Sequence, residues 1–330
     1  MAKVRRNRKS TKGSHLWTVV LAAALAAALA GGSVLFALRY HVPESHAESD
    51  PVSVTEPTSP VRTLPKAFID LNTFSPYIVL KDITNDRVLY SKAADTKCYP
   101  ASLTKLVTAL VATEVLTPET EITVGTEIRL IDPYSSRANL TVGMRMTFEQ
   151  LMQAMLLPSG NDAAYAMAAC AGRLLAGNEN LTHKEAIAFF CGKMNEKAQA
   201  LGCTGTHFVN PDGIHDAAHF TTAADMTRIA AAVLENDLIA RTVATPEVND
   251  RLLSGETVHW QSSNRLIRPD NLYTYEGATG MKTGSTKEAG NCLIASATLD
   301  GRTCVAVMMG AEKDSDRWDD ATGLLDLCFQ

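Results

Sequence analysis

A serine and a lysine three residues apart stand at the start of an apolar run, Leu106–Leu116. Pro100 presets φ for a first helical turn and lacks an N–H that would find no partner there, so we expect a helix to begin at this point. Residues three apart project from the same side of a helix, which would bring the Ser102 hydroxyl to the Lys105 amine. Such a pair can act as a nucleophile and its base.

This chemistry makes demands on the surroundings of the pair. A serine hydroxyl is a weak nucleophile until a base removes its proton, and a lysine can be that base only if burial or nearby positive charge lowers its pKa. A helix N-terminus adds partial positive charge where an oxyanion would form. Alone, however, Ser-x-x-Lys arises about once by chance in a chain of this length. The alternative is an exposed lysine on a surface turn.

Two further polar segments follow in an informative order. Ser159-Gly160-Asn161 comes after an apolar helical pattern, and Lys282-Thr283-Gly284 precedes two strand-like runs. Ser-x-x-Lys, Ser-Asp-Asn and Lys-Thr-Gly together are the signature of penicillin-binding proteins and class A β-lactamases. Taken singly, the third segment could be a strand edge that leads into a turn, and Ser159 could be an ordinary helix N-cap.

The wider sequence around these motifs closely resembles the low-molecular-mass penicillin-binding proteins, the serine-type D-alanyl-D-alanine carboxypeptidases. The resemblance extends over roughly residues 67–327. It implies the α/β (α+β) fold of the β-lactamases and DD-peptidases, in which both ends of the domain form an antiparallel sheet flanked by helices, with an all-helical subdomain. The matching segments are Pro100–Lys105, Leu156–Ala164, Thr206–Gly213 and the segment around Lys282.

The resemblance implies catalytic roles for five residues. Ser102 would attack the carbonyl of the penultimate D-alanine and form an acyl-enzyme, while Lys105 takes its proton. Ser159 would relay that proton to the departing D-alanine. Asn161 would hydrogen-bond the substrate amide and steady Lys105. Lys282 would add positive potential that helps to keep the Lys105 amine neutral.

The remaining implied roles concern the binding of the substrate. Thr283 and Arg317 would bind its terminal carboxylate, for which the planar donor fork of arginine is suited. Gly284 would let the backbone approach the substrate, and the N–H groups of Ser102 and Ser285 would form the oxyanion hole. Arg317 lies among four aspartates in the sequence, so a surface ion pair is the alternative role for its side chain.

The function expected from these motifs is the removal of the terminal D-alanine from peptidoglycan pentapeptides ending in D-Ala-D-Ala, with β-lactams acylating the same serine. A class A β-lactamase would also need a Glu-x-x-Leu-Asn element, and Glu196–Ala200 lacks its Leu and Asn. We therefore expect slow deacylation by penicillin. A non-catalytic scaffold with the same fold is a further alternative, which the three intact motifs disfavour. Transfer of the acyl group to a second peptide stays open.

Histidines do not point to a different chemistry. His207, His215 and His219 lie close together in the sequence, but no H-E-x-x-H or comparable ligand spacing surrounds them. Ser102, the serine that fits a catalytic motif, already has Lys105 as its expected base, which argues against a Ser-His-Asp triad. We expect no metal and no cofactor.

Charge is unevenly distributed along the 330 residues. Six of the 31 basic residues lie in the first twelve positions without an acidic residue among them, which leaves 25 basic against 36 acidic residues in the remainder. An acidic body argues against nucleic acid as a partner. Residues 1–15 form a basic tip that we expect to stay in the cytoplasm.

An uncharged apolar stretch, residues 16–38, is long enough to cross a bilayer as a helix. We expect a bacterial membrane anchor with the catalytic domain outside the cytoplasm. A cleaved signal peptide with its cleavage site at Ala28-Leu29-Ala30 is the alternative and would give a secreted protein. The apolar run continues beyond that site, which favours the anchor. Residues 39–66 predict a Pro- and Ser-rich linker, and residues 67–330 the catalytic domain.

Two pairs of β-rich runs lie near the two ends of this domain and predict two hairpins. Asp300-Gly301, between the runs of the second pair, is a strong turn signal. A two-residue turn there pairs Ala297 with Cys304 and Cys292 with Met309. The runs are Ser75–Asp82 and Arg87–Tyr90 in the first pair, and Cys292–Leu299 and Thr303–Met309 in the second.

The middle of the domain shows apolar residues at helical spacing. Thr147 opens a Thr-x-x-Gln capping pattern and Pro158 ends the helix that follows, so the Ser159-Gly160-Asn161 segment joins two helices. The predicted helices are Thr147–Leu157, Asp162–Leu175, Lys184–Leu201 and Thr222–Leu234.

Seven cysteines are spread over the domain without a C-x-x-C pair that would suggest zinc. Export would permit disulfides, but a domain of this size does not need them for stability. We expect mostly buried thiols, with Cys191–Cys203 or Cys170–Cys191 as the candidate disulfides.

Overall fold

The structure is a computed structural model that describes residues 72–269 and 271–330. The predicted basic tip, membrane segment and linker lie outside the described residues. Within the described residues, no helix combines the length and the apolar character needed to cross a bilayer.

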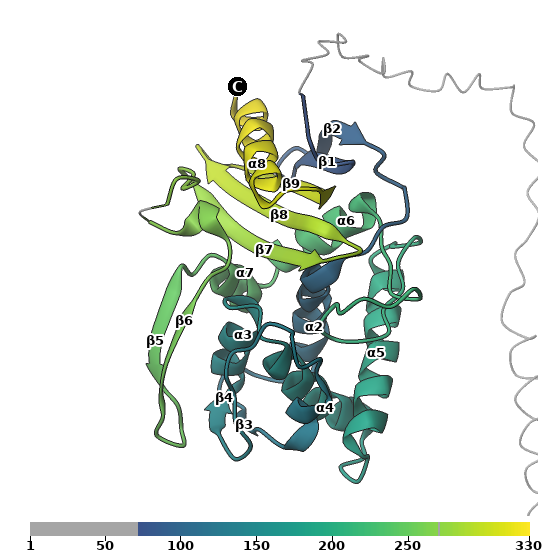
Figure 1. Cartoon of the computed structure of the whole chain (residues 1–330), viewed down its shortest axis with the longest axis vertical. Helices are drawn as coiled ribbons and strands as arrows, with labels where there is room; N and C mark the ends of the chain where they lie inside the picture. Colours follow the sequence, from purple (N-terminus) through teal and green to yellow (C-terminus); the bar gives the residue numbers. More distant parts are fainter. Residues whose placement is uncertain (1–71, 270) are drawn as a thin grey trace, which may run out of the picture. The chain divides into compact units, whose positions relative to one another are not determined.

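Strands from both ends of the described chain form one antiparallel sheet of five strands, in the order β2-β1-β9-β8-β7 (Figure 1). The strands are β1 (Tyr77–Asp82), β2 (Arg87–Lys92), β7 (Ala278–Thr286), β8 (Gly290–Leu299) and β9 (Arg302–Ala311). This arrangement confirms the sheet predicted from the two hairpins. It also places β7, which carries the Lys-Thr-Gly motif, at one edge of the sheet.

Both faces of the sheet are covered. Side chains alternate between the faces of a strand, so Ile78 packs into one apolar cluster with Trp318 while Val79 packs into the larger cluster around Leu106. One face is covered by the C-terminal helix α8 (Asp314–Phe329) and the other by α6 (Ala223–Leu234) and α7 (Asp237–Val243). Burial on both faces explains why the central strands β8 and β9 read as nearly continuous apolar runs.

A bundle of helices lies on the far side of the sheet from α8 (Figure 1). Its central helix α2 (Lys105–Ala112) is buried along its whole length and packs against α4, α5 and α6. Lys105, the first residue of α2, is therefore enclosed by protein. The other helices of the bundle are α3 (Phe148–Leu156), α4 (Asn161–Ala176) and α5 (His183–Ala200).

The helix boundaries follow the capping signals in the sequence. Thr147 accepts a hydrogen bond from the backbone N–H of Gln150, whose side chain accepts one from the N–H of Thr147, so the predicted capping box is present. Pro158 lies just beyond the end of α3, and Ser159-Gly160-Asn161 joins α3 to α4 as predicted.

The C-terminal hairpin has the predicted turn and register over most of its length. Ala297 pairs with Cys304 as expected. The predicted pairing of Cys292 with Met309 is wrong, because a bulge between Asn291 and Leu293 shifts the register at the end of the hairpin.

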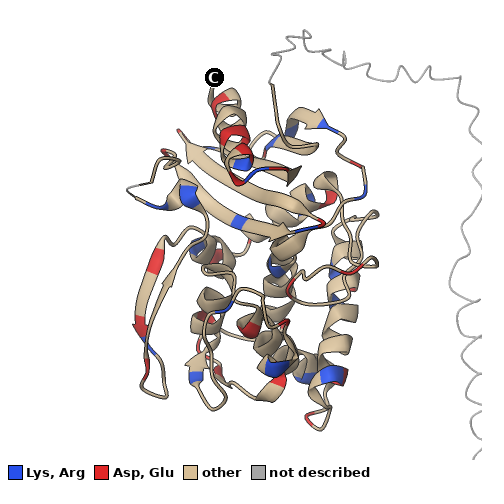
Figure 2. Cartoon of the chain, in the orientation of Figure 1, with Lys and Arg blue, Asp and Glu red and all other residues tan. Residues whose placement is uncertain are grey.

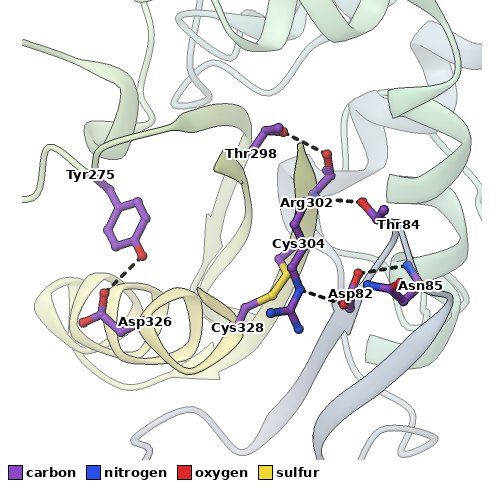
Figure 3. The surroundings of a disulfide bond; sticks show 10 residues. Asp82, Thr84, Asn85, Tyr275, Thr298, Arg302, Cys304, Asp326 and Cys328 are labelled. Atoms are coloured by element: carbon purple, nitrogen blue, oxygen red, sulfur yellow. Dashed lines mark hydrogen bonds and ion pairs between the residues drawn. A yellow bond between two sulfur atoms is a disulfide. The ribbon is translucent and has the colours of Figure 1, made fainter. Parts of the chain in front are cut away.

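The disulfide prediction is wrong. Cys304 forms a disulfide with Cys328 (Figure 3). Cys170, Cys191 and Cys203 are free. Cys304 lies on β9 and Cys328 on α8, which packs against that strand. No helix was predicted at the C-terminus, so nothing in the predicted elements brought the two cysteines together. Most of the free thiols are buried, as expected.

Several elements of the described residues were not predicted from the sequence. Helices α7 and α8 lie outside the predicted set, and so do two small two-stranded sheets and three 3₁₀ helices. These are β3 (Glu121–Thr123) with β4 (Arg145–Thr147), β5 (Glu247–Arg251) with β6 (Thr257–Gln261), and η1 (Ala101–Thr104), η2 (Thr126–Leu130) and η3 (Arg265–Ile267).

Candidate active site

Ser102 lies in the 3₁₀ turn η1, and Lys105 begins α2. The predicted α-helix therefore starts later than Pro100. Ala101 adopts a φ of +47°, which a right-handed α-helix excludes, so only a tight turn fits at this point. The turn still brings Ser102 and Lys105 to the same side, and the Lys105 Nζ lies 2.8 Å from the Ser102 Oγ.

Three oxygen atoms surround the Lys105 amine. Besides Ser102 Oγ, these are Asn161 Oδ1 at 2.7 Å and the carbonyl oxygen of Asp212 at 2.9 Å. The amide and carbonyl oxygens can only accept. A protonated amine would donate to all three oxygens. A neutral amine has two protons for the amide and carbonyl oxygens and a lone pair for the proton of the Ser102 hydroxyl, so the geometry fits both forms and the pKa of Lys105 decides between them.

Burial favours this neutral form. Lys105 is fully buried, and its removal from water lowers its pKa to about 8, while the carboxyl groups of Asp212 and Asp162 act in the opposite direction. A free lysine has a pKa above 10. About a tenth of the Lys105 amine is then unprotonated at pH 7, a far larger share than for a free lysine, and this share increases as the pH rises through 8.

The second motif is held by a short loop that precedes it in the chain. The Asn161 backbone N–H donates to the carbonyl oxygen of Ser136 at 2.9 Å, and the Ser136 hydroxyl donates to the carbonyl oxygen of Ser159 at 2.6 Å. Ser159 adopts a φ of +64° and is buried. These contacts place the Asn161 side chain against Lys105.

Asp162 is a supporting residue to which the sequence analysis gave no role. Its carboxylate accepts hydrogen bonds from the backbone N–H groups of Ala138 at 2.8 Å and Leu140 at 2.9 Å, and so ties their loop to the start of α4. An aspartate in the first turn of a helix is favoured by the helix dipole. The acidic residue directly after the motif was the signal that could have indicated this role.

The third motif lies on β7 and contacts the turn that carries Ser102. Gly284 approaches the turn so closely that a Cβ at this position would stand 3.0 Å from the backbone nitrogen of Ser102 and 3.0 Å from the carbonyl oxygen of Pro100. The contact explains the need for glycine in this motif. The backbone of β7 is thereby placed beside the predicted oxyanion donor.

Lys282 is fully buried, and its Nζ donates to the carbonyl oxygen of Thr283 at 3.0 Å. Its pKa is lowered well below the usual value, chiefly by burial and further by the positive charges of Lys105 and Arg317. The two buried amines would repel each other if both were protonated, so at most one of them is expected to carry a positive charge. The role of Lys282 as a source of positive potential stays a prediction.

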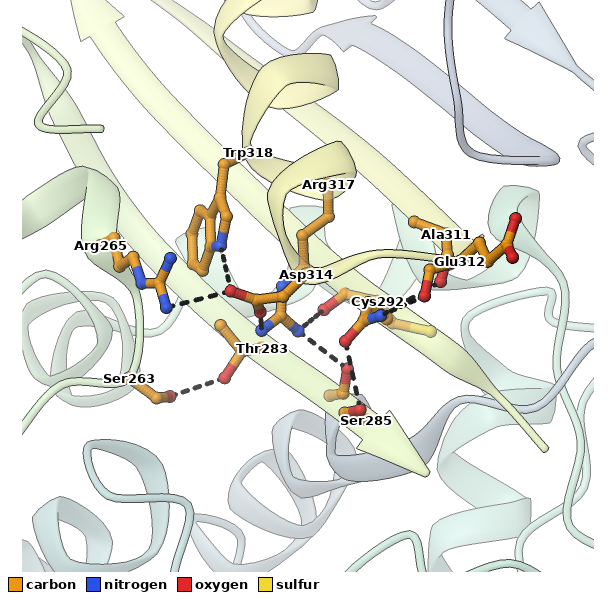
Figure 4. Close-up of polar contacts among 12 residues, drawn as sticks. Ser263, Arg265, Thr283, Ser285, Cys292, Ala311, Glu312, Asp314, Arg317 and Trp318 are labelled. Carbon is orange, nitrogen blue, oxygen red and sulfur yellow. Dashed lines mark hydrogen bonds and ion pairs between the residues drawn. The ribbon is translucent and has the colours of Figure 1, made fainter. Parts of the chain in front are cut away.

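Arg317 lies in the first turn of α8, above β7 and β8 (Figure 4). Its Nη1 donates to the carbonyl oxygens of Gly284 and Cys292, each at 3.1 Å, and its Nη2 forms an ion pair with Asp314. The guanidinium therefore makes its hydrogen bonds and its ion pair with groups of the protein itself. Thr283 forms a hydrogen bond of 2.6 Å with Ser263. That these groups bind a carboxylate stays a prediction.

Charged residues are distributed unevenly around this region. Figure 2 shows acidic residues along α8 and a basic position within β7. Arg317 is buried but its partner Asp314 is 44% exposed, so the ion pair considered as the alternative role of Arg317 is present at the edge of the protein surface.

A cleft of about 350 Å³ opens beside the motifs. Ser102, Asn161 and Ser285 line it together, so residues from η1, α4 and β7 reach one space. Lys105, Lys282 and Thr283 are buried and are not among the lining residues. The remaining lining residues are Asp132, Tyr134, Ser135, Ser136, Gly213, Ile214, His215, Thr286, Lys287 and Glu288.

A loop between α5 and α6 supplies contacts that the sequence did not predict. The carbonyl oxygen of Asp212 accepts from Lys105, and the Asp212 carboxyl is buried, with its Oδ2 unpartnered among the described residues. The next residue, Gly213, has a φ of +87°, and a Cβ there would stand 1.8 Å from the carbonyl oxygen of Ala101. Glycine is therefore needed for the loop to reach the turn.

The family model for D-alanyl-D-alanine carboxypeptidases, Peptidase_S11, matches residues 70–313. The chain belongs to this family. It is 33% identical over 254 residues to a D-alanyl-D-alanine carboxypeptidase of Streptomyces sp. strain K15, a match that covers 73% of this chain and 82% of the relative. It is 32% identical to D-alanyl-D-alanine carboxypeptidase DacF of Bacillus subtilis, with 76% of this chain and 61% of DacF covered.

Solved structures agree with the family assignment. The crystal structure of the Streptomyces K15 DD-transpeptidase superposes with a TM-score of 0.70 at 31% identity, covering 78% of this chain and 97% of that one. D-alanyl-D-alanine carboxypeptidase DacD of Francisella tularensis superposes with a TM-score of 0.66 at 25% identity, covering 78% and 70%. The predicted fold of the β-lactamases and DD-peptidases is confirmed.

The side chains of His207 and His215 contact neighbouring groups of the protein. His207 Nδ1 lies 2.7 Å from the carbonyl oxygen of Ala218, and the His215 ring packs edge-on against Tyr99. In the part of the chain that the structure describes, no group of three or more His, Cys, Asp or Glu side chains is arranged to hold a metal ion.

The pH dependence of acylation should report the Lys105 pKa. Because the neutral amine is the base, the rate should rise with pH through a pKa near 8. A negative charge at Asp212 raises that pKa, so Asp212→Asn, which keeps an oxygen for the Ile214 N–H, should move the rise to lower pH. Penicillin acylation rates measured across pH test this shift.

A matched control for this shift is Asp216→Asn in the same loop. Asp216 is exposed and accepts a hydrogen bond from the Ala218 N–H, which an asparagine oxygen can also accept. Its pH profile should match that of the unaltered protein. An Asp212→Asn profile that coincides with both would show that the Asp212 carboxyl carries no charge in the working range.

Proposed function

We infer that this chain is a serine D-alanyl-D-alanine carboxypeptidase that acts on peptidoglycan stem peptides and is acylated by β-lactams. The observation that carries this inference is the Lys105 amine, which lies 2.8 Å from the Ser102 hydroxyl while two acceptor-only oxygens take its other positions. Membership of the family and the names of its relatives agree with the inference.

In the proposed reaction the Ser102 oxygen attacks the carbonyl carbon of the penultimate D-alanine as its proton passes to the Lys105 amine. The backbone N–H groups of Ser102 and Ser285 would stabilise the oxyanion. Ser159 would return the proton to the nitrogen of the departing D-alanine when the peptide bond breaks. Water then hydrolyses the acyl-enzyme and regenerates the serine.

A β-lactam would enter the same sequence of steps. Its ring amide carbonyl would be attacked by Ser102, but the cleaved amine stays attached to the acyl group and does not leave the cleft. The chain lacks the Glu-x-x-Leu-Asn element with which class A β-lactamases activate the deacylating water. Deacylation should therefore be slow and the protein should be a target of the drug.

Transfer of the acyl group to a second peptide is the other candidate activity, because the structural neighbour from Streptomyces K15 is described as a DD-transpeptidase. Adding an amine acceptor to the assay separates the two reactions. Free D-alanine with no joined product indicates hydrolysis, and a dimeric product indicates transfer.

We also propose that residues 16–38 anchor the protein in the bacterial cell membrane, with the catalytic domain on the outer side. The uncharged apolar stretch and the basic residues before it support this placement. Cleavage of the segment would instead give a secreted enzyme. The mass of the protein isolated from membranes distinguishes the two.

The proposed function is tested with the full chain purified in detergent. It should release D-alanine from a peptide ending in D-Ala-D-Ala, and intact-protein mass spectrometry should show the gain of one penicillin per chain. Prior acylation by penicillin should reduce the rate of D-alanine release in proportion to the fraction of chains acylated. A chain that neither releases D-alanine nor gains mass would refute the proposed function and favour the non-catalytic scaffold.

A further inference from the structure

A chain of hydrogen bonds connects the loop after α5 to the backbone just before Ser102. The Val209 backbone N–H donates to His219 Nδ1 at 3.1 Å, and His219 Nε2 lies 2.8 Å from Thr104 Oγ1. The Thr104 hydroxyl in turn donates to the carbonyl oxygen of Ala101 at 2.8 Å. His219 and Thr104 are both buried.

Each bond of this chain has one possible direction. A backbone N–H can only donate, so His219 Nδ1 supplies a lone pair and the ring proton lies on Nε2. Nε2 therefore donates to the Thr104 hydroxyl, whose own proton goes to Ala101. Burial lowers the pKa of His219 to about 4, which agrees with a neutral ring.

The chain of hydrogen bonds ends on the peptide group that joins Ala101 to Ser102. A planar trans peptide points its C=O and its N–H in opposite directions. The carbonyl is held by Thr104, and the N–H belongs to Ser102, whose nitrogen faces Gly284 on β7. An anchor on the carbonyl therefore sets the direction of the N–H that would stabilise the oxyanion.

This peptide group needs an anchor because its geometry is unfavourable. Ala101 has a φ of +47°, a region that residues with a Cβ rarely adopt. Gly213 presses against the same carbonyl from the loop, since a Cβ there would stand 1.8 Å from Ala101 O and 2.9 Å from Thr104 Oγ1. Loop and threonine together hold the carbonyl in one place.

We propose that Thr104 and His219 are positioning residues that orient the Ser102 N–H as an oxyanion donor. The inference rests on the proposed acylation of Ser102. Both side chains act through the backbone of Ala101, and neither lines the cleft.

The test compares Thr104→Val, which keeps the shape but removes the hydroxyl, with Thr104→Ser, which keeps the hydroxyl. We expect the valine variant to be acylated by penicillin about 10- to 100-fold more slowly, somewhat less than the loss of a whole oxyanion donor. The serine variant should stay within about threefold of the unaltered chain. Thr227→Val, which removes a buried hydroxyl bonded to Ala223 in α6, is the matched control.

A second measurement separates positioning from stability. Affinity for a boronic acid transition-state analogue should fall in the valine variant by about the same factor as acylation, while KM for the peptide stays nearly unchanged. His219→Asn retains an acceptor for the Val209 N–H but loses the donor to Thr104, and should slow acylation by a smaller factor. This variant keeps the proposal testable if Thr104→Val does not fold.

Three outcomes would overturn the proposal. One is a folded Thr104→Val protein with normal acylation and a lowered Tm alone, and another is a serine variant as slow as the valine variant. The third is a slower reaction caused entirely by a raised KM. An unaltered chain that penicillin does not acylate would instead refute the proposed function, so the two failures are distinguishable.

Discussion

Replacing Ser102 with alanine is expected to abolish covalent labelling by fluorescent penicillin and the release of D-alanine. No other atom of the proposed mechanism can form the acyl bond, so the loss should be complete. The hydroxyl is bonded to Lys105 Nζ, which keeps two other acceptors, and the variant should therefore fold normally. Gel fluorescence and intact-protein mass measure the labelling, and circular dichroism checks the fold.

Ser159→Ala is the informative comparison, because Ser159 is the other serine with an implied catalytic role. It is buried, is not among the residues that line the cleft, and would pass a proton without forming a bond to the substrate. This variant should still gain the mass of one penicillin, but more slowly. If Ser102→Ala were labelled and Ser159→Ala were not, the two roles would have to be exchanged.

The parts of the fold that the sequence predicted are those with local signals. The capping pattern at Thr147 and the break at Pro158 gave both ends of α3, and Asp300-Gly301 gave the turn of the last hairpin. Each signal acts within a few residues of the chain, where backbone geometry and hydrogen-bond capacity decide the outcome.

The three motifs predicted which residues meet but not how they are supported. Lys105 contacts Ser102 and Asn161 as implied, and the Asp212 carbonyl completes its surroundings. Every residue has a backbone carbonyl, so a hydrogen bond to a distant carbonyl does not depend on the residue type. Such a contact cannot be predicted from the sequence. Gly213 was the one available sign, because a close backbone approach requires glycine.

The disulfide was missed for a related reason. Pairing of cysteines depends on which elements pack together, and Cys328 is placed by α8, whose apolar residues gave no clear start signal. The Asp316 carboxylate accepts a hydrogen bond from the backbone N–H of Lys313 at 3.2 Å, so this helix begins without the usual serine or threonine N-cap. Without the helix, the spacing of the cysteines alone favoured the wrong partners.

Removal of the Lys105 amine is the second change with a large expected effect. Lys105→Gln should lower the rate of acylation about 10³-fold, within the range that a general base contributes. The NH₂ group of the glutamine amide can donate to Asn161 and Asp212, so the buried oxygens keep partners, but its nitrogen is not basic and cannot take the serine proton. The second-order rate constant for penicillin acylation is the measurement. Lys193→Gln on α5, which removes a lysine paired with Glu196, should leave the rate constant unchanged.

The same position allows a test of the base by chemical rescue. Lys105→Ala leaves a buried cavity beside Ser102, and small primary amines added to the solution can enter it. If the added amine acts as a base, only its unprotonated form should restore acylation, so rescue should become stronger as the pH rises. Among different amines, rescue should increase with the basicity of the neutral amine. Rescue by the cationic form, strongest at low pH, would contradict a base and show that Lys105 acts only through its charge. The two results differ in sign, because one form accepts the serine proton and the other can only stabilise an oxyanion.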